Sequence, residues 1–211
     1  PGTCDVTGEK YSDVPAFEEL GNARELNVRL GDGTTSKVVI RASLSKATTR
    51  QIEGLSNAGD RPIGHYCNKN LGVSIVRAGR ELELNKSWNI NYDTTERWWG
   101  LEISFEPALD DFFGVSNNKQ HANHLRRLDI KEDAENEGMK RSEYMENLMN
   151  SEDDRRILYD ISSEVDIALR NIRSQLGSQT KGKKDKQNKD KRKVETSVTG
   201  SINERRDEGK Y

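Results

Sequence analysis

The clearest pattern in the chain lies at residues 25–42, ELNVRLGDGTTSKVVIRA. Apolar and polar residues alternate from Glu25 to Leu30, as they do in a half-buried strand, and a second β-rich run returns at Lys37–Ala42. Between the two runs, Gly31–Thr34 supplies the residue types of a turn. The stretch therefore predicts an antiparallel hairpin.

Further strands are predicted downstream of this hairpin. Gly72–Arg77 reads GVSIVR, the pair Ala78-Gly79 suits a tight turn, and Glu81–Leu84 alternates again. The run Arg97–Phe105, RWWGLEISF, combines aromatic and β-branched residues, which favour a pleated, half-buried surface. We expect Trp98 and Trp99, being adjacent in this strand, to point to opposite faces of the sheet.

Short helices are predicted between these strands, at Ser43–Ile52, at Pro107–Phe113 and from Lys119 to Arg127, whereas the breaker-rich stretch 54–64 reads as a surface loop. Several antiparallel strands with short helices interspersed indicate an α+β fold with a mostly antiparallel sheet. We assign residues 1–128 to this domain.

A helical extension is predicted over residues 129–177. Ser142–Met149 suits a short helix, and Ser151 is placed to cap the start of a long amphipathic helix over 153–176 that Gly177 would end. Its apolar stripe must be buried against its own domain or against a partner helix. The stripe comprises Ile157, Ile161, Val165, Leu169, Ile172 and Leu176, with Leu158 and Ala168 beside it.

Composition separates the C-terminal end from the rest. The chain has 211 residues, 33% of them charged, with a formal net charge of −2 and a mean hydropathy of −0.95. Residues 178–211 contain few large apolar side chains, so we predict that they are disordered. Within them, Lys181–Lys193 carries eight cations and two aspartates, which suits either a phosphate backbone or a solvated linker.

No run of apolar residues is long enough to span a membrane, and the N-terminus has no signal-peptide pattern. The two cysteines, Cys4 and Cys67, are far apart in the sequence, and a reduced, cytoplasmic compartment is the simplest expectation. The chain begins with Pro1 rather than Met, which favours a piece of a longer protein.

The candidate site lies in DDFFGVSNNKQHANH, residues 110–124. Its polar loop holds one cation, Lys119, between the amides Asn117, Asn118 and Gln120. A lysine offers an anion a point charge with three donors, and a helix beginning at Lys119 would add free backbone N–H groups. The alternative is an ordinary solvated loop lysine.

Three blocks of sequence, taken in order, resemble a known domain. They are Gly72–Leu82 (GVSIVRAGREL), Arg97–Ile103 (RWWGLEI) and Asn117–Gln120 (NNKQ). Together they are similar to the transducer, or second, domain of GHKL-superfamily ATPases, closest to bacterial histidine-kinase-like and microrchidia-type ATP-binding proteins. The resemblance covers residues 23–125 and implies the fold shared with a domain of ribosomal protein S five.

The resemblance also implies a function. Lys119 would enter the nucleotide pocket of an upstream GHKL domain, contact the terminal phosphate of ATP, and couple the nucleotide state to domain closure and homodimerisation. Asn117, Asn118 and Gln120 would hold the loop, while ATP and Mg²⁺ would be bound mainly by the upstream domain. In sequence, residues 1–211 contain neither that domain's motifs nor a Gly-x-x-x-x-Gly-Lys-[Ser/Thr] loop, so we expect this chain alone not to hydrolyse ATP.

A second hypothesis is a non-enzymatic module that binds nucleic acid through Lys181–Lys193 or a protein through the long helix. Arg77 and Arg80, beside the Ala78-Gly79 turn, are interpreted as surface arginines rather than nucleic-acid contacts. No metal site is predicted, because the histidines and cysteine that invite one lack the paired spacing of zinc ligands. Those residues are His65, Cys67, His121 and His124.

Overall fold

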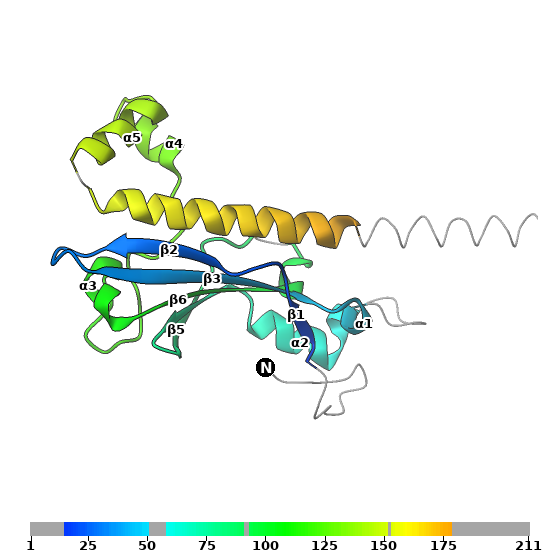
Figure 1. The fold of residues 1–211 in the computed structure, drawn as a ribbon. Helices are drawn as coiled ribbons and strands as arrows, with labels where there is room; N and C mark the ends of the chain where they lie inside the picture. The colour runs from blue at the N-terminus through cyan, green and yellow to red at the C-terminus, as the bar shows by residue number, and fades with distance from the viewer. Residues whose placement is uncertain (1–14, 51–57, 91–92, 152, 179–211) are drawn as a thin grey trace, which may run out of the picture. The chain divides into compact units, whose positions relative to one another are not determined.

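The computed structural model describes residues 15–50, 58–90, 93–151 and 153–178. The chain divides into two compact units, Pro1–Ile172 and Arg173–Tyr211. Within the described residues, the first unit combines a six-stranded sheet with helices, so the predicted α+β class is confirmed (Figure 1). The predicted disordered tail and Cys4 lie outside the described residues, apart from Ser178.

The predicted hairpin is confirmed. Strands β2 (Arg24–Arg29) and β3 (Thr35–Ser45) pair antiparallel, from Arg24 opposite Ile40 to Arg29 opposite Thr35. The short strand β1 (Phe17–Glu19) pairs antiparallel with the other half of β3. Strands β1 and β2 therefore lie in line along one edge of β3.

The remaining strands extend the sheet from the other edge of β3. Strand β6 (Trp99–Phe105) is antiparallel to β3, β4 (Val73–Arg77) is parallel to β6, and β5 (Arg80–Asn85) is antiparallel to β4. The sheet is therefore mixed, with one parallel pair among the described strands. Strand β6 starts at Trp99 rather than Arg97, because a 3₁₀ turn, η2 (Glu96–Trp98), precedes it.

One face of the sheet forms the main core. Trp99, Leu101, Ile103 and Phe105 of β6 are all buried, whereas the residues between them are only half-buried. This alternation is what a strand with one covered face requires. Their cross-strand partners on the same face are also buried: Val38, Ile40 and Leu44 of β3, and Val73 and Ile75 of β4.

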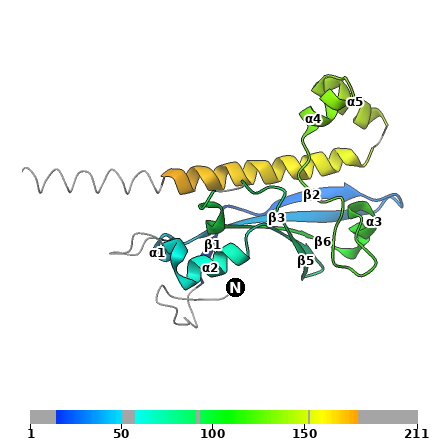
Figure 2. The same cartoon turned by 180° about the vertical axis from the view of Figure 1, so that it is seen from behind.

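The long helix is present, with helical residues 155–178 in the described part of the chain. Ile161, Val165, Leu169 and Ile172 of its apolar stripe are almost fully buried. Figures 1 and 2 show residues 155–172 of the helix beside β2 and β3, and an Arg24–Glu164 ion pair of 3.9 Å links this part of the helix to β2. Within the first unit, the stripe is therefore covered by the chain's own sheet.

Two short helices precede the long one. Helix α5 (Arg141–Asn150) confirms the predicted helix, whereas α4 (Ile130–Asn136), capped by the Asp129 carboxylate, was not predicted. The two helices pack around Ala134, Tyr144, Leu148 and Tyr159. The cap of the long helix is Asp153, whose carboxylate accepts from the Arg155 N–H at 2.8 Å. Ser151 instead ends α5, so its predicted capping role is wrong.

Two local predictions are corrected between β3 and β4. The predicted helix at 43–52 is reduced to α1 (Ala47–Arg50), because Ser43–Ser45 continue β3. The predicted loop 54–64 gives way to the turn η1 (Ala58–Asp60) and the helix α2 (Pro62–Lys69), while 51–57 lie outside the described residues. Pro62 occupies the first turn of α2, where proline costs no hydrogen bond.

After β6, the turn η3 (Pro107–Leu109) and the helix α3 (Asp110–Phe113) confirm the predicted helix. Among the described residues, none of the helices is both long enough and apolar enough to cross a bilayer.

Candidate functional site

The candidate loop is the tip of a β-hairpin, not the start of a helix. Val115 and Ala122 form an isolated antiparallel bridge, and the Ser116 N–H donates to the His121 carbonyl at 3.0 Å. The Lys119 N–H donates to the Ser116 carbonyl at 2.7 Å, which closes the turn. The predicted helix over 119–127 is therefore wrong, and with it the expected row of free N–H groups beside Lys119.

Lys119 adopts a left-handed backbone conformation, with φ of 53°. A residue in this conformation commonly ends the type I turn of a short hairpin loop, and Gly or Asn usually fills the position. A β-carbon there costs about 1–2 kcal/mol. The tip of the hairpin thus holds a long cationic side chain where the backbone geometry favours a small one.

The neighbouring polar residues hold one another in the loop. The Ser116 hydroxyl donates to the Asn118 side-chain oxygen at 2.6 Å, and the Asn118 amide donates to the Gln120 side-chain oxygen at 3.0 Å. The Ser116 hydroxyl also accepts from the Gln120 and His121 N–H groups, at 3.3 and 3.2 Å. Of the three predicted helpers, Asn118 and Gln120 are part of this network, whereas Asn117 is an exposed residue of the turn.

The Lys119 amine is paired with a carboxylate of its own domain. Its Nζ donates to Asp110 Oδ2 at 2.9 Å, and the Lys119 side chain keeps 48% exposure. The same carboxylate accepts two hydrogen bonds from Arg77, from Nε at 2.5 Å and from Nη2 at 2.8 Å. Asp110 therefore joins the end of β4, the start of α3 and the hairpin tip.

This arrangement places two cations around one acid. Arg77, by its hydrogen bonds, and then Lys119 hold the pKa of the Asp110 carboxyl below its ordinary value. Arg77 and Asp110 are mostly buried, with 18% and 19% of their side chains exposed. Arg77 is thus a structural partner of Asp110, whereas the sequence suggested a surface arginine.

Three side-chain contacts, on two sides, fix the base of the hairpin. One Glu83 oxygen of β5 lies 2.8 Å from His121 Nδ1, and the other accepts from the Ala122 N–H at 3.3 Å. On the other side, His124 Nδ1 lies 2.9 Å from the Phe112 carbonyl oxygen. The hairpin is therefore attached to both the sheet and α3.

The four residues considered as metal ligands are divided between the hairpin and α2, and the two hairpin histidines contact other groups. His121 and His124 contact Glu83 and the Phe112 carbonyl, as described. Cys67 is a free, buried thiol in α2, and burial raises its pKa to about 11. His65 lies on the exposed side of the same helix.

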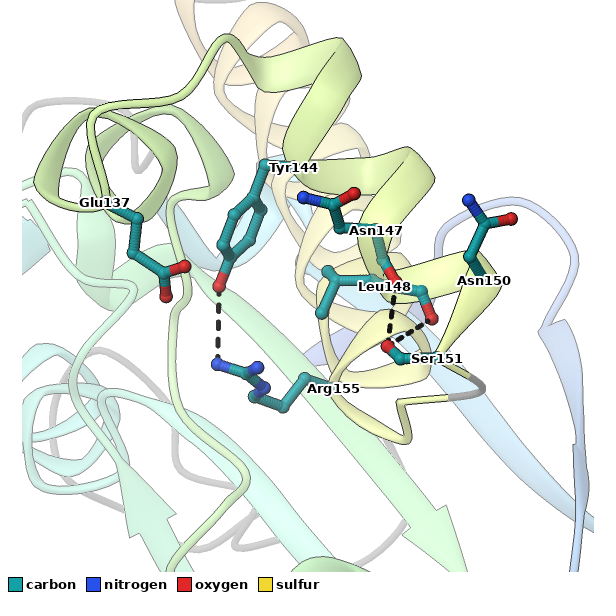
Figure 3. A pocket seen from close by; sticks show the side chains of 7 residues that line it. All are labelled: Glu137, Tyr144, Asn147, Leu148, Asn150, Ser151 and Arg155. Atoms are coloured by element: carbon teal, nitrogen blue, oxygen red, sulfur yellow. Dashed lines mark hydrogen bonds between the residues drawn. The ribbon is translucent and has the colours of Figure 1, made fainter.

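Two cavities lie beside α5 and the start of the long helix, and Lys119 lines neither. The first, of about 390 Å³, contains the Tyr144 hydroxyl, which points toward Arg155 at 3.4 Å (Figure 3). The second, of about 760 Å³, is lined by more acids than bases, an environment that repels a triphosphate. Its acids are Asp111, Asp133, Glu137, Asp153 and Asp154, and its bases are His124, Arg126 and Arg155.

Comparison of the chain with protein-family models, with curated proteins and with solved structures gives no match. The GHKL resemblance therefore stays a prediction from the sequence blocks.

Proposed function

We propose that this chain is the transducer portion of a GHKL-type ATPase and that Lys119 senses the terminal phosphate of ATP bound by an upstream nucleotide-binding domain. The observation that carries the proposal is the conformation of Lys119. Lys119 is half-exposed and has a left-handed backbone conformation at the tip of a hairpin whose base is fixed by side-chain contacts. Left-handed residues other than glycine are enriched at functional sites, and Gly or Asn would fit this turn at lower cost. Ala78 is also left-handed, with φ of 46°, but among the described residues only Lys119 places a charged side chain at such a position.

The pairing of Lys119 is compatible with this task. An ion pair with one exposed partner contributes about 0–1 kcal/mol, so the amine leaves it at little cost. The terminal phosphate of ATP carries more negative charge than one carboxylate and offers three acceptor oxygens. Asp110 keeps both hydrogen bonds from Arg77 when Lys119 departs, so no buried charge is left alone.

The hairpin can transmit the position of Lys119 to the sheet. Glu83 attaches the base of the hairpin to the edge strand β5, and β5 pairs with β4. A pull on the lysine would thus act on two neighbouring strands. Domain closure around ATP and Mg²⁺, followed by pairing of two copies, is the proposed consequence.

ATP itself would be held by the upstream domain. The larger of the two cavities beside α5 is acidic, and the sequence has no nucleotide-binding motif. In this proposal the chain contributes the Lys119 amine and the hairpin that connects it to the sheet, and the upstream domain contributes the nucleotide-binding pocket.

The proposal is tested on the gene product that carries the upstream domain. Lys119→Ala should lower the turnover of ATP by about 100-fold, because a donor to the transition-state charge is lost, while nucleotide affinity changes little. Lys37→Ala is the matched control, since Lys37 is also an exposed lysine paired with one acid, Glu25, at 2.8 Å. Unchanged turnover in Lys119→Ala would refute the sensor role.

The second candidate function is a binding module that uses the long helix or the basic tail. Within the first unit, the stripe residues Ile161, Val165, Leu169 and Ile172 are buried, so this part of the helix face is already occupied. The basic run Lys181–Lys193, outside the described residues, is then the feature on which nucleic-acid binding depends. Salt-dependent retention on DNA that disappears when 178–211 is deleted would favour this role.

A further inference from the structure

The cluster of Arg77, Asp110 and Lys119 holds one more cation than its carboxylate needs. Arg77 already satisfies both carboxylate oxygens with the bidentate geometry that guanidinium groups favour. Lys119 adds a third hydrogen bond, to Oδ2, from a side chain that is 48% exposed. The two cations thus differ: Arg77 is fixed and mostly buried, and Lys119 is the replaceable partner.

Position in the fold reinforces this difference. Arg77 ends β4, inside the sheet, and Asp110 begins α3, which ends in the buried Phe113. Lys119 instead lies at the tip of a hairpin whose strands share a single bridge, Val115 with Ala122. Any motion within the cluster is therefore expected at Lys119.

Resting on the function proposed above, we infer that Asp110 is the resting partner of Lys119: it restrains the lysine until a phosphate competes for it, and Arg77 keeps Asp110 in place after the lysine leaves. Asp110 is in this sense a positioning residue that opposes premature engagement of the sensor. Removing the charge of Asp110 should weaken its ion pair with Lys119 and free the amine. Removing the bidentate hydrogen bonds from Arg77 should strengthen that ion pair, because Lys119 is then the main partner of the Asp110 carboxylate.

The restraint is measured on this chain alone, without nucleotide. A trace amount of an amine-reactive acylating reagent labels free amines, and mass spectrometry reports the rate at each lysine. Asp110→Asn, which preserves shape and one acceptor for Arg77, should raise labelling of Lys119 about two- to fivefold, the range for loss of an exposed ion pair. Arg77→Lys, which retains the charge and loses the bidentate fork, should lower labelling of Lys119.

The two variants should change the labelling of Lys119 in opposite directions. Unfolding would instead raise the labelling in both variants, so the pair of results distinguishes loss of the restraint from loss of structure. Glu25→Gln is the matched control: it should raise labelling of Lys37, its partner at 2.8 Å, and leave Lys119 unchanged. Equal labelling of Lys119 in the parent chain and in Asp110→Asn would overturn the restraint, whatever the ATPase does.

The second arm uses the gene product with its upstream domain and measures the ATP concentration that gives half-maximal hydrolysis. Asp110→Asn should lower this concentration about two- to fivefold. If Lys119→Ala abolishes turnover and Asp110→Asn leaves the concentration unchanged, the restraint is refuted and the sensor role stands. If Lys119→Ala leaves turnover intact, the sensor role is refuted, and the ion-pair restraint stands or falls on the labelling experiment alone.

Discussion

The imidazole ring of His124 fills the space that a β-carbon on Gly114 would need, with ring atoms 2.9 Å from that position. Gly114 also ends α3 in a left-handed conformation, with φ of 60°. Helix α3 and the hairpin thus meet at a point where two independent features require glycine. The position of the lysine-bearing loop depends on this contact.

Gly114→Ala should therefore lower the free energy of unfolding by about 2–4 kcal/mol, from backbone strain and from the clash with His124. Gly138→Ala is the matched control, because Gly138 has φ of 69° and open space around its β-carbon position. We expect it to cost about 1 kcal/mol. Urea unfolding followed by circular dichroism measures both, and equal losses in the two variants would contradict the contact.

The sheet and the long helix were largely predictable, because they follow from periodicity. Alternation over 25–42 defines the hairpin β2–β3, and the spacing from Ile161 to Ile172 defines the buried face of the helix. Helix α2 was missed because Pro62 and Gly64 read as breakers, although Pro62 stands where a helix accepts it. Local patterns thus predicted the strands and the long helix, whereas α2 and α4 were missed and the helix predicted over 119–127 is absent.

The site was predictable only in part. The sequence singles out Lys119 as the one cation of a polar loop, but Arg77 and Asp110 are 33 residues apart, and no spacing rule joins them. The left-handed conformation of Lys119 was likewise hidden, since Asn117 and Asn118 are better suited to it by residue type. The contact between Arg77 at the end of β4 and Asp110 at the start of α3 depends on the tertiary fold, which one sequence does not display.

Lys119→Gly should separate stability from function. Glycine relieves about 1 kcal/mol of left-handed strain, which offsets the loss of an ion pair that contributes about 0–1 kcal/mol. The free energy of unfolding should therefore stay the same or rise slightly, while the proposed ATPase activity is lost. Urea unfolding of this chain and hydrolysis by the gene product with the upstream domain provide the two measurements. A marked loss of stability would instead assign Lys119 a structural role.

Leu169→Ala should destabilise the first unit by about 2–5 kcal/mol, because Leu169 is fully buried and the substitution leaves a cavity. Leu158→Ala, at a half-buried position on the same helix, should cost at most about half as much. The midpoint of urea unfolding reports both. Similar small effects would mean that the helix is not part of the core of the sheet domain.

The last prediction concerns pH. Because Arg77 and Lys119 lower the pKa of Asp110, ionised Asp110 stabilises the folded chain above its unfolded pKa of about 3.9, and this contribution disappears as pH falls through the lower folded value. Asp110→Asn should therefore be less stable than the parent at pH 7, and the two should converge in strong acid. Urea unfolding from pH 7 down to about pH 2 measures the difference between the curves. A constant difference between Asp110→Asn and the parent chain at every pH would show that the two cations do not favour the ionised carboxylate in the folded state.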